Sequence, residues 1–284
     1  MNRRVMVCAS ALMLTAGVVF GGVQFTSVTR SEGPQATTLT VRGWAEGNSA
    51  RVEFVEGTLP MASKDGYMIT RDGGQTLFLV NPEEKTYARF DLDAMLGTLG
   101  SVMQSIGPLV KIEFKDPKVE QLGSGPGEVL LGMPTTHLRF RTSYAMEMRI
   151  FGRRTAQSIV NDEEVWVTTG LGDMGLRAWL RKGPPKTGDP EFDKLIAAQW
   201  QMYEGFPLKT VTVATTTDDK GKSQTTRTVM EVTSLEVTSI PDSTFVIPAG
   251  YTETQLVPMA EGQQGEGEAG ENPLSRLFGG RKNR

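Results

Sequence analysis

Residues 137–150 (HLRFRTSYAMEMRI) constrain the fold of this 284-residue chain more than any other segment. Its apolar side chains alternate with polar ones, and the apolar set is Leu138, Phe140, Tyr144, Met146, Met148 and Ile150. Period two is the spacing of a β-strand with one buried face, and a shift by one residue would invert every side chain. At about 3.3 Å per residue this strand would be about 45 Å long, which favours a strongly curved sheet.

Shorter segments with the same period predict further strands. They lie near residues 39–42, 51–54, 66–71, 76–81, 86–90, 110–116, 127–132, 156–169, 208–217 and 225–239. Asp72-Gly73-Gly74 between two of them favours a hairpin turn, because glycine adopts positive φ freely. We expect a glycine-rich turn between 110–116 and 127–132. A change of parity in the last strand predicts a bulge near Thr233.

Two segments have helical spacing instead. In 91–106 an apolar stripe at i, i+3, i+4 and i+7 includes Met95, Leu99 and Met103. Gly97 and Gly100 weaken this helix by about 1 kcal/mol each relative to Ala, so its stability must come from docking on the sheet. The second helix is predicted over 190–204, where Pro190 suits the first helical position.

Strands outnumber helices, and the helices are interspersed. The fold class is therefore mainly β (α+β): a curved antiparallel sheet, or half-barrel, with covering helices. We expect one half-barrel domain over 37–256. Residues 257–284 form a tail whose Gly-rich, acidic first part is low in complexity, which is typical of disorder.

The N-terminus has the order of an export signal. Arg3 and Arg4 precede an uncharged run, 5–25, and a polar stretch follows. The run is also long enough to be an N-terminal anchor, so residues 1–25 are a signal peptide or an anchor. Val19-Phe20-Gly21 and Ala16-Gly17 are the candidate cleavage sites. Either reading places the domain in the periplasm or cell envelope.

Composition excludes several classes of function. The formal net charge is −3, with 30 Lys and Arg against 33 Asp and Glu, and we expect no nucleic-acid binding, which needs a clustered basic surface. The chain has one Cys and one His. One Cys excludes an intrachain disulfide, and one His excludes metal sites and triads that need two. We expect no cofactor and no metal.

The polar residues suggest little catalysis. His137 lies on the polar face of its strand, where we expect a surface residue without partners for base catalysis. Asp162-Glu163-Glu164 could offer carboxylates to a cation, although a turn between strands is an ordinary place for them. Gly123–Gly127 lacks the lysine and following helix of a phosphate loop and is expected to be a turn.

Two groups of side chains favour binding rather than catalysis. Five arginines near one strand suit phosphate or an acidic partner, or else a solvated face paired with Glu: Arg139, Arg141, Arg149, Arg153 and Arg154. The 14 methionines suit either an ordinary core or a surface that adapts to apolar ligands. Candidate ligand-binding residues are Met95, Leu99, Met103, Leu138, Phe140, Tyr144, Met146 and Met148, with helix 91–106 as a loosely held lid over the sheet.

The segment Ile240–Tyr251 (IPDSTFVIPAGY) resembles the close of bacterial envelope domains related to the LolA/LppX-like lipoprotein carriers, whose relatives end in Phe-x-x-Pro-x-Gly-Tyr. Glu204–Lys209, Val165–Val167, the early Arg51–Phe54 strand and Asn81–Tyr87 are similar to the same group. The resemblance covers roughly 38–251. It implies an exported, curved antiparallel sheet with covering helices and an apolar cavity. The carriers shield lipoprotein acyl chains, but none of their functional residues matches here by motif.

The leading expectation is a noncatalytic envelope protein that binds an apolar ligand, a lipid or a lipoprotein acyl chain, in the sheet concavity. The alternative is a structural or regulatory protein-interaction module of the envelope with a filled core. The expected partners are a lipid or a lipidated protein. The C-terminal tail, with Leu274, Leu277 and Phe278 among basic residues, can touch a membrane transiently or remain a solvated end.

Overall fold

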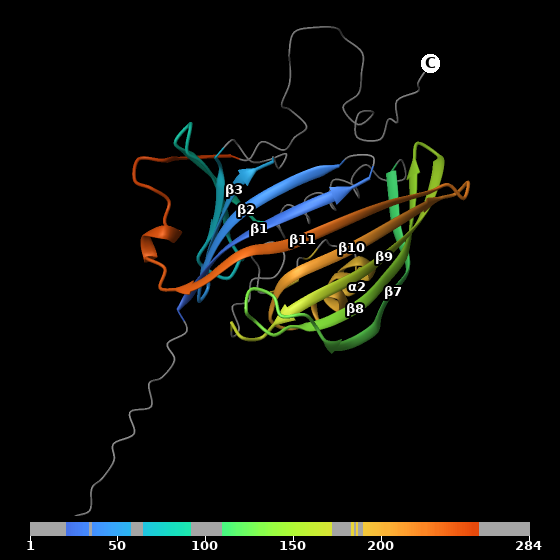
Figure 1. Ribbon diagram of the computed structural model, residues 1–284. Coiled ribbons are helices and arrows are strands. Elements are labelled where there is room, and N and C mark those ends of the chain that lie inside the picture. The colour runs from blue at the N-terminus through green and yellow to red at the C-terminus, as the bar shows by residue number, and fades with distance from the viewer. Residues whose placement is uncertain are drawn as a thin grey trace, which may run out of the picture.

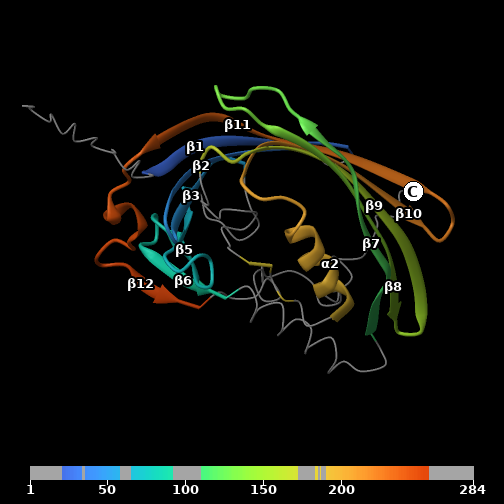
Figure 2. The same cartoon turned by 90° about the horizontal axis from the view of Figure 1, so that it is seen from below.

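A single continuous sheet dominates the computed structural model, which describes residues 21–33, 36–57, 65–91, 110–171, 183–184, 186 and 190–255. The twelve strands run in the order β12-β6-β5-β4-β3-β2-β1-β11-β10-β9-β8-β7. Neighbouring strands are antiparallel except β12, which is parallel to β6, so the sheet is mixed. Figures 1 and 2 show it bent into an open arch with α2 on the inside, as the curved half-barrel prediction requires.

The elements follow the chain in short and long hairpins. The strands are β1 (Gly22–Glu32), β2 (Thr37–Glu46), β3 (Ser49–Glu56), β4 (Tyr67–Thr70), β5 (Leu77–Asn81), β6 (Thr86–Phe90), β7 (Val110–Pro126), β8 (Thr136–Ile150), β9 (Arg153–Thr168), β10 (Phe206–Asp218), β11 (Ser223–Thr238) and β12 (Thr252–Thr254). The described helices are α2 (Pro190–Trp200) and the 3-10 turn η3 (Asp242–Phe245).

The strand with the clearest period two is confirmed. β8 pairs along its whole length with β9 and with β7. Phe140 is 2% exposed and Thr142 is buried beside it on the same face. The bulge predicted in β11 is also present, because Thr26 pairs with Ser234 whereas Ser27 pairs with Val232, which leaves Thr233 extra.

The sheet begins at Gly22 rather than at residue 37. β1 was missed because Val23 and Phe25 belong to the uncharged run read as a signal or anchor, while the rest of the strand is rich in Ser and Thr. It lies at the centre of the sheet, between β2 and β11. The ring of Phe25 lies over Gly43 on β2, where a Cβ would come within 2.2 Å of it.

Two other expectations change at the β7–β8 hairpin. The Gly123–Pro126 segment, expected as a turn, continues β7 and pairs with β8; an edge strand tolerates Pro and Gly because one side needs no ladder partner. Residues 127–132, expected as a strand, form the loop, closed by a bridge between Leu130 and Met133. The predicted helix 91–106 and the tail 257–284 lie outside the described residues.

Helix α2 starts where the sequence predicts and ends at Trp200 rather than at 204. Pro190 occupies its first position, where its missing N–H removes no helical bond. Gly205 then starts the return to the sheet at φ 102°, and a Cβ there would lie 2.5 Å from the carbonyl oxygen of Thr168. Only glycine allows the chain to pass β9 this closely.

The segment after β11 folds back over the far side of the sheet. Ile240 and Phe245 pack into a cluster with Tyr67, Ile69 and Val80, and Phe245 is 2% exposed. The guanidinium of Arg51 lies 3.8 Å from the centre of the Tyr67 ring and donates to the carbonyl of Thr244 at 3.3 Å. The segment ends in β12, which extends the sheet at β6. The segment Ile240–Tyr251, whose sequence resembles the ending of the LolA-related domains, therefore fixes the end of the chain against the sheet, and it is called the clamp.

Candidate functional site

The face of the sheet that α2 covers is called the inner face here. Phe192 of α2 stacks on Phe114 of β7 at 4.2 Å and meets Tyr144 of β8 edge-on at 6.1 Å. Gln199 donates to the hydroxyl of Thr142 at 3.1 Å. Because side chains alternate along each strand and paired residues share a face, these contacts fix the inner face across the whole sheet.

The candidate residues of β8 share this inner face. Leu138, Phe140, Tyr144, Met146 and Met148 alternate along it, as the period predicts. Tyr203 lies 6.4 Å from Phe140 between ring centres, and burial raises the pKa of Tyr144. The helix over this part of the sheet is α2, whereas the lid prediction gave that role to 91–106. Met95, Leu99 and Met103 lie outside the described residues.

A second apolar surface, the apolar flank, occupies the inner face at the other end of the arch. Ala50, Val52, Phe54 and Leu77 form a buried cluster there, with Leu39, Val41 and Met68 against it. Of the described helices, α2 has its main sheet contact with β7, and η3 contacts β3 from the opposite face. Sequence reasoning recognised these strands but did not single out their apolar side chains as a site.

Between the two apolar ends, the middle strands carry hydroxyl groups on the inner face, and this stretch is called the hydroxyl crest. By register it comprises Ser27, Thr29 and Ser31 of β1, Thr226 and Thr228 of β11, and Thr210, Thr212 and Thr216 of β10. The Ser31 and Thr228 hydroxyls lie 3.3 Å apart. Met230, Val232, Ala214 and Gln224 also face inward on these strands. Val232 packs in a buried apolar cluster with Val23, Phe206 and Leu208. Toward the Ser31 end of β1 the inner face therefore changes from apolar to polar to apolar across the arch, whereas toward the Val23 end the middle strands are apolar as well.

Glu163 borders the hydroxyl crest on β9. Its register partners are Phe140 on β8 and Thr212 on β10, so its carboxyl belongs to the inner face. Burial raises the pKa of Glu163. Asp162, Glu163 and Glu164 thus lie inside a strand rather than in a turn, and they point to alternate faces. Among the described residues no cluster of His, Cys, Asp and Glu could hold a metal ion.

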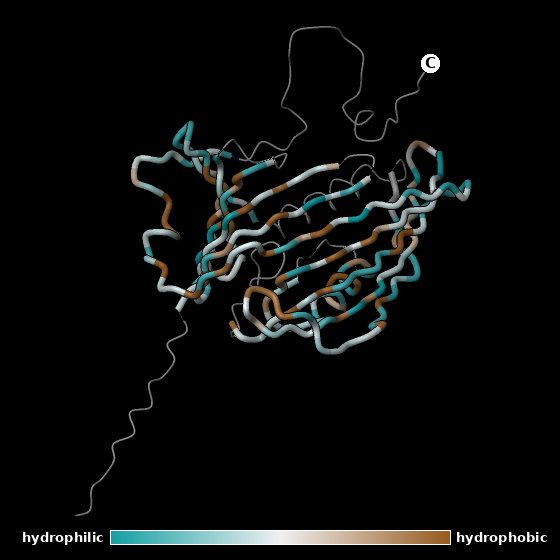
Figure 3. Tube along the Cα trace, in the orientation of Figure 1, coloured by the Kyte–Doolittle hydropathy of each residue, from teal (hydrophilic) through white to brown (hydrophobic). Residues whose placement is uncertain are grey.

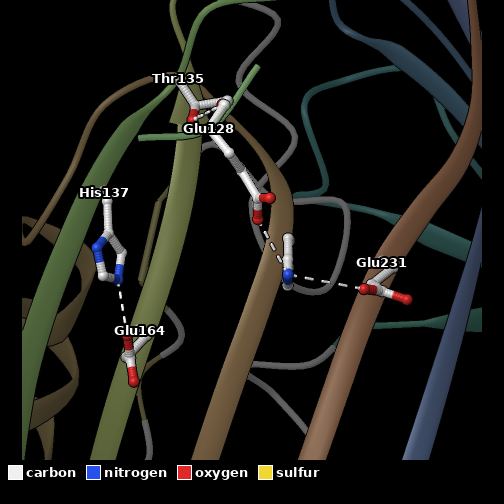
Figure 4. Close-up of polar contacts among 6 residues, drawn as sticks. Glu128, Thr135, His137, Glu164 and Glu231 are labelled. Carbon is white, nitrogen blue, oxygen red and sulfur yellow. Dashed lines mark hydrogen bonds and ion pairs between the residues drawn. The ribbon is translucent and has the colours of Figure 1, made fainter. Parts of the chain in front are cut away.

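The opposite, outer face carries a polar network around Trp166, and Figure 4 shows part of it, including the contact of His137 with Glu164. His137 lies there as predicted, but it is not without partners: its Nε2 is 2.7 Å from a Glu164 carboxylate oxygen, and its ring stacks on Trp166 at 4.3 Å. Lys209 lies over the same indole and contacts Glu128 at 3.0 Å and Glu231 at 3.9 Å. Charge pairs and ring contacts account for these groups, and the network joins β8, β9, β10, β11 and the β7–β8 loop.

The five arginines fall into separate environments. Arg141 makes a two-pronged contact with Asp162 at 2.6 and 2.9 Å, and Arg154 binds Glu147. The side chain of Arg139 lies along Gly123 of β7. Arg149 and Arg153 make no ion pair within the described part of the chain. Pairing with acidic residues therefore explains two of the five.

A search of known proteins shows the family. The profile described as "Domain of unknown function (DUF4412)" matches residues 44–251, from β2 to the end of the clamp. No curated protein sequence matches the chain. None of the described helices is long and apolar enough to span a bilayer.

Solved structures similar to this chain are distant. A LolA superfamily protein from Nitrosomonas europaea is 13% identical, with a TM-score of 0.30, over 80% of this chain and 91% of its own. A DUF1329 family protein from Desulfovibrio piger is 11% identical, with a TM-score of 0.30, over 81% and 91%. PNGF-II is 14% identical, with a TM-score of 0.33, over 83% of this chain but 31% of its own.

One of these structures thus belongs to the LolA superfamily, the group that the sequence resembles. At these scores the likenesses carry no argument about function. The family match covers about three quarters of the sequence, and the protein therefore belongs to the family described as "Domain of unknown function (DUF4412)".

Proposed function

We propose that this protein is a noncatalytic binding protein of the cell envelope that shelters the apolar part of an amphiphile on the inner face of its sheet. The amphiphile is a lipid or the acyl chain of a lipidated protein. The observation that carries the proposal is the apolar flank on the inner face of β2 to β5. Ala50, Val52, Phe54 and Leu77 are already buried there, so the side chains that a ligand would contact are the partly buried Leu39, Val41 and Met68.

The driving force would be the removal of apolar surface from water. Burial gives about 25 cal/mol per Å² of apolar area, or about 0.8 kcal/mol per CH₂ group. A chain of ten methylenes fully buried on the flank would contribute about 8 kcal/mol before the entropy of association is subtracted. Partial burial would still hold the chain, so no catalytic group or covalent bond is needed.

The hydroxyl crest gives the ligand a direction. An acyl chain on the apolar flank would place its polar head beside the Ser and Thr hydroxyls of β1, β11 and β10. Hydroxyl groups both donate and accept hydrogen bonds. Glu163, at the far border of the crest, adds a carboxyl that is more readily protonated than usual. The inner face therefore suits a ligand with one apolar and one hydrogen-bonding end.

The start of β1 bears on the export proposal. Cleavage after Gly21, at the candidate Val19-Phe20-Gly21 site, would leave β1 complete. If the uncharged run is instead a membrane anchor, the anchor cannot include Gly22–Phe25, because these residues pair with β11 and β2. That leaves residues 5–21, which is the short limit for a membrane span. Edman sequencing of the protein from its own envelope would identify the mature end.

Ligand binding is tested directly by native mass spectrometry of protein purified from its own envelope, followed by lipid extraction. A fluorescent fatty acid then provides a titration. Met68→Ser places a hydroxyl on the apolar flank and should weaken binding at least tenfold. Val55→Ser is the matched control, because Val55 is 54% exposed on the neighbouring strand. Equal affinities of the two variants would contradict the proposal.

The alternative remains a protein-interaction module with a filled core. The packing of α2 on Phe114 and Tyr144 favours it locally, since those side chains already have partners. It predicts no copurifying lipid and no response to acyl ligands. Hydrogen exchange of residues 91–106 separates the two functions: a lid should exchange faster than β8 and slow down when fatty acid is added.

A further inference from the structure

The turn between β8 and β9 has a side chain that its backbone disfavours. Ile150 pairs with Arg153, and the two residues between them, Phe151 and Gly152, have φ of 48° and 78°. Positive φ at both central positions defines a type I′ hairpin turn, for which Asn-Gly is the usual sequence. A bulky residue in the left-handed region is a genuine outlier. Phenylalanine at this position therefore opposes the local conformation.

Packing does not explain the presence of Phe151. Phe151 is 64% exposed, although the transfer of an aromatic ring out of water stabilises a folded protein. A Cβ on the adjacent Gly152 would have no neighbour within 4 Å, so the tip is open on that side as well. Figure 1 shows this turn at the end of a long hairpin, and Figure 3 shows the hydrophobic colour at that end.

The charge around the tip is strongly positive. Arg149, Arg153 and Arg154 are all exposed, and the strand register puts Arg149 directly opposite Arg154. Like charges in directly opposed positions destabilise a strand pair. Glu147, two residues before Arg149, already binds Lys115 at 2.9 Å as well as Arg154.

Arg149 and Arg153 have no acidic partner within the described part of the chain. The whole protein carries a net charge of −3, so this cationic end is local rather than a reflection of composition. Guanidinium groups bind phosphate oxygens with two parallel hydrogen bonds. A partner rich in phosphate would relieve the repulsion between the arginines.

We propose that the tip of the β8–β9 hairpin docks on the surface of an anionic lipid bilayer. Phe151 enters the boundary between head groups and acyl chains, and Arg149 and Arg153 bind lipid phosphates. An anionic bilayer is the partner that offers an apolar layer directly beneath a layer of phosphate, and the tip presents an aromatic ring ahead of arginines in the same order. The proposal does not depend on ligand binding at the inner face.

Cosedimentation of the full-length chain with vesicles tests the proposal. Vesicles contain phosphatidylglycerol with phosphatidylcholine, or phosphatidylcholine alone. We expect binding to the anionic vesicles, weakened by salt because screening shortens the range of surface charge. Arg149→Ser with Arg153→Ser should reduce the partition constant by about 5-fold for each arginine, about 25-fold together.

Phe151→Asn is the decisive variant. Asparagine tolerates the left-handed region, so a merely structural role predicts an unchanged or raised melting temperature and unchanged sedimentation. Membrane docking predicts at least about 5-fold weaker sedimentation despite that stability, because the apolar ring is lost.

The matched control is Leu131→Asn. Leu131 has φ 51°, precedes Gly132 and is 44% exposed, but its neighbours in sequence from Leu130 to Pro134 include no arginine. It should sediment like wild type. All variants share the same N-terminal apolar run and C-terminal tail, so contributions from those segments cancel.

A local probe completes the test. In a Cys8→Ser background, Phe151→Cys carrying an environment-sensitive dye should shift to the blue on anionic vesicles, whereas Leu131→Cys should not. Equal sedimentation of Phe151→Asn and wild type, or of wild type on both kinds of vesicle, overturns the proposal.

Discussion

The clamp formed by the segment after β11 provides a quantitative test of the fold. Phe245→Ala removes a ring that is 2% exposed and packed among Tyr67, Ile69, Val80 and Ile240. The substitution leaves η3 itself intact, because alanine is compatible with helical backbone. Its effect therefore measures how firmly the clamp is docked on the outer face.

The expected loss follows from the burial of the ring. Transfer of a fully buried Phe side chain accounts for about 1.5–3 kcal/mol, and the cavity left behind raises the total for Phe→Ala to about 3–5 kcal/mol. For a folded domain of this size, 1 kcal/mol corresponds to about 2–4 °C in melting temperature. Phe245→Ala should therefore lower the melting temperature by about 6–20 °C.

Urea denaturation followed by tryptophan fluorescence measures this loss. Trp44 packs against the same cluster, so its emission reports the docking site. The matched control is Val246→Ala, because Val246 is the next residue and is 43% exposed; its loss should stay below about 0.5 kcal/mol. If the two variants differ by less than about 1 kcal/mol, the clamp is not part of the cooperative core and the reasoning is wrong.

Three further variants test other parts of the structure. Burial raises the pKa of Glu163 above 4.5, so the free energy of unfolding of the wild type should fall as pH rises from 4.5 through the folded-state pKa. Glu163→Gln should remove this fall and should be more stable than the wild type at neutral pH, as measured by urea titration. Hydrogen bonds from Lys115 and Arg154 lower the pKa of Glu147 to about 2. The stabilisation by its carboxylate is therefore present above pH 4.5 and disappears as pH falls toward 2. The difference in free energy of unfolding between wild type and Glu147→Gln should shrink across that pH range. Gly43→Ala puts a Cβ 2.2 Å from the Phe25 ring and should cost about 1–3 kcal/mol, whereas Gly125→Ala, which meets nothing within 4 Å, should cost less than 0.5 kcal/mol in the same denaturation experiment.

The strands with strong period two and the second helix could be predicted from the sequence alone. The alternation in β8 determines both its existence and its register, because a slip would bury Arg139 and Arg141. Pro190 marks the start of the helix through a backbone rule that needs no tertiary context, whereas the helix ends at Trp200, before the expected stop. The bulge at Thr233 was likewise visible as a change of parity. These features are local, so neighbours in sequence are sufficient to specify them.

Other elements could not be predicted because their partners are distant. β1 has few apolar residues after Phe25, and its hydrogen-bond ladder forms with β11, about two hundred positions later in the chain. Backbone pairing does not require an apolar pattern, so a hydroxyl-rich central strand leaves little signal. The reverse occurred at Gly123–Pro126, which was predicted as a turn but is part of a strand. Glycine and proline are typical of turns, but they are also compatible with an edge strand.

The candidate site divides in the same way. The sequence determined which side chains of β8 share a face, and it drew attention to the arginines near that strand. Only the tertiary structure decided that α2 covers those side chains, that the apolar flank and hydroxyl crest complete the inner face, and that Phe151 lies exposed among arginines instead of in the core. Period two specifies two faces of a strand, but whether a face meets a helix, a ligand or solvent depends on the curvature of the whole sheet and on segments brought together across it.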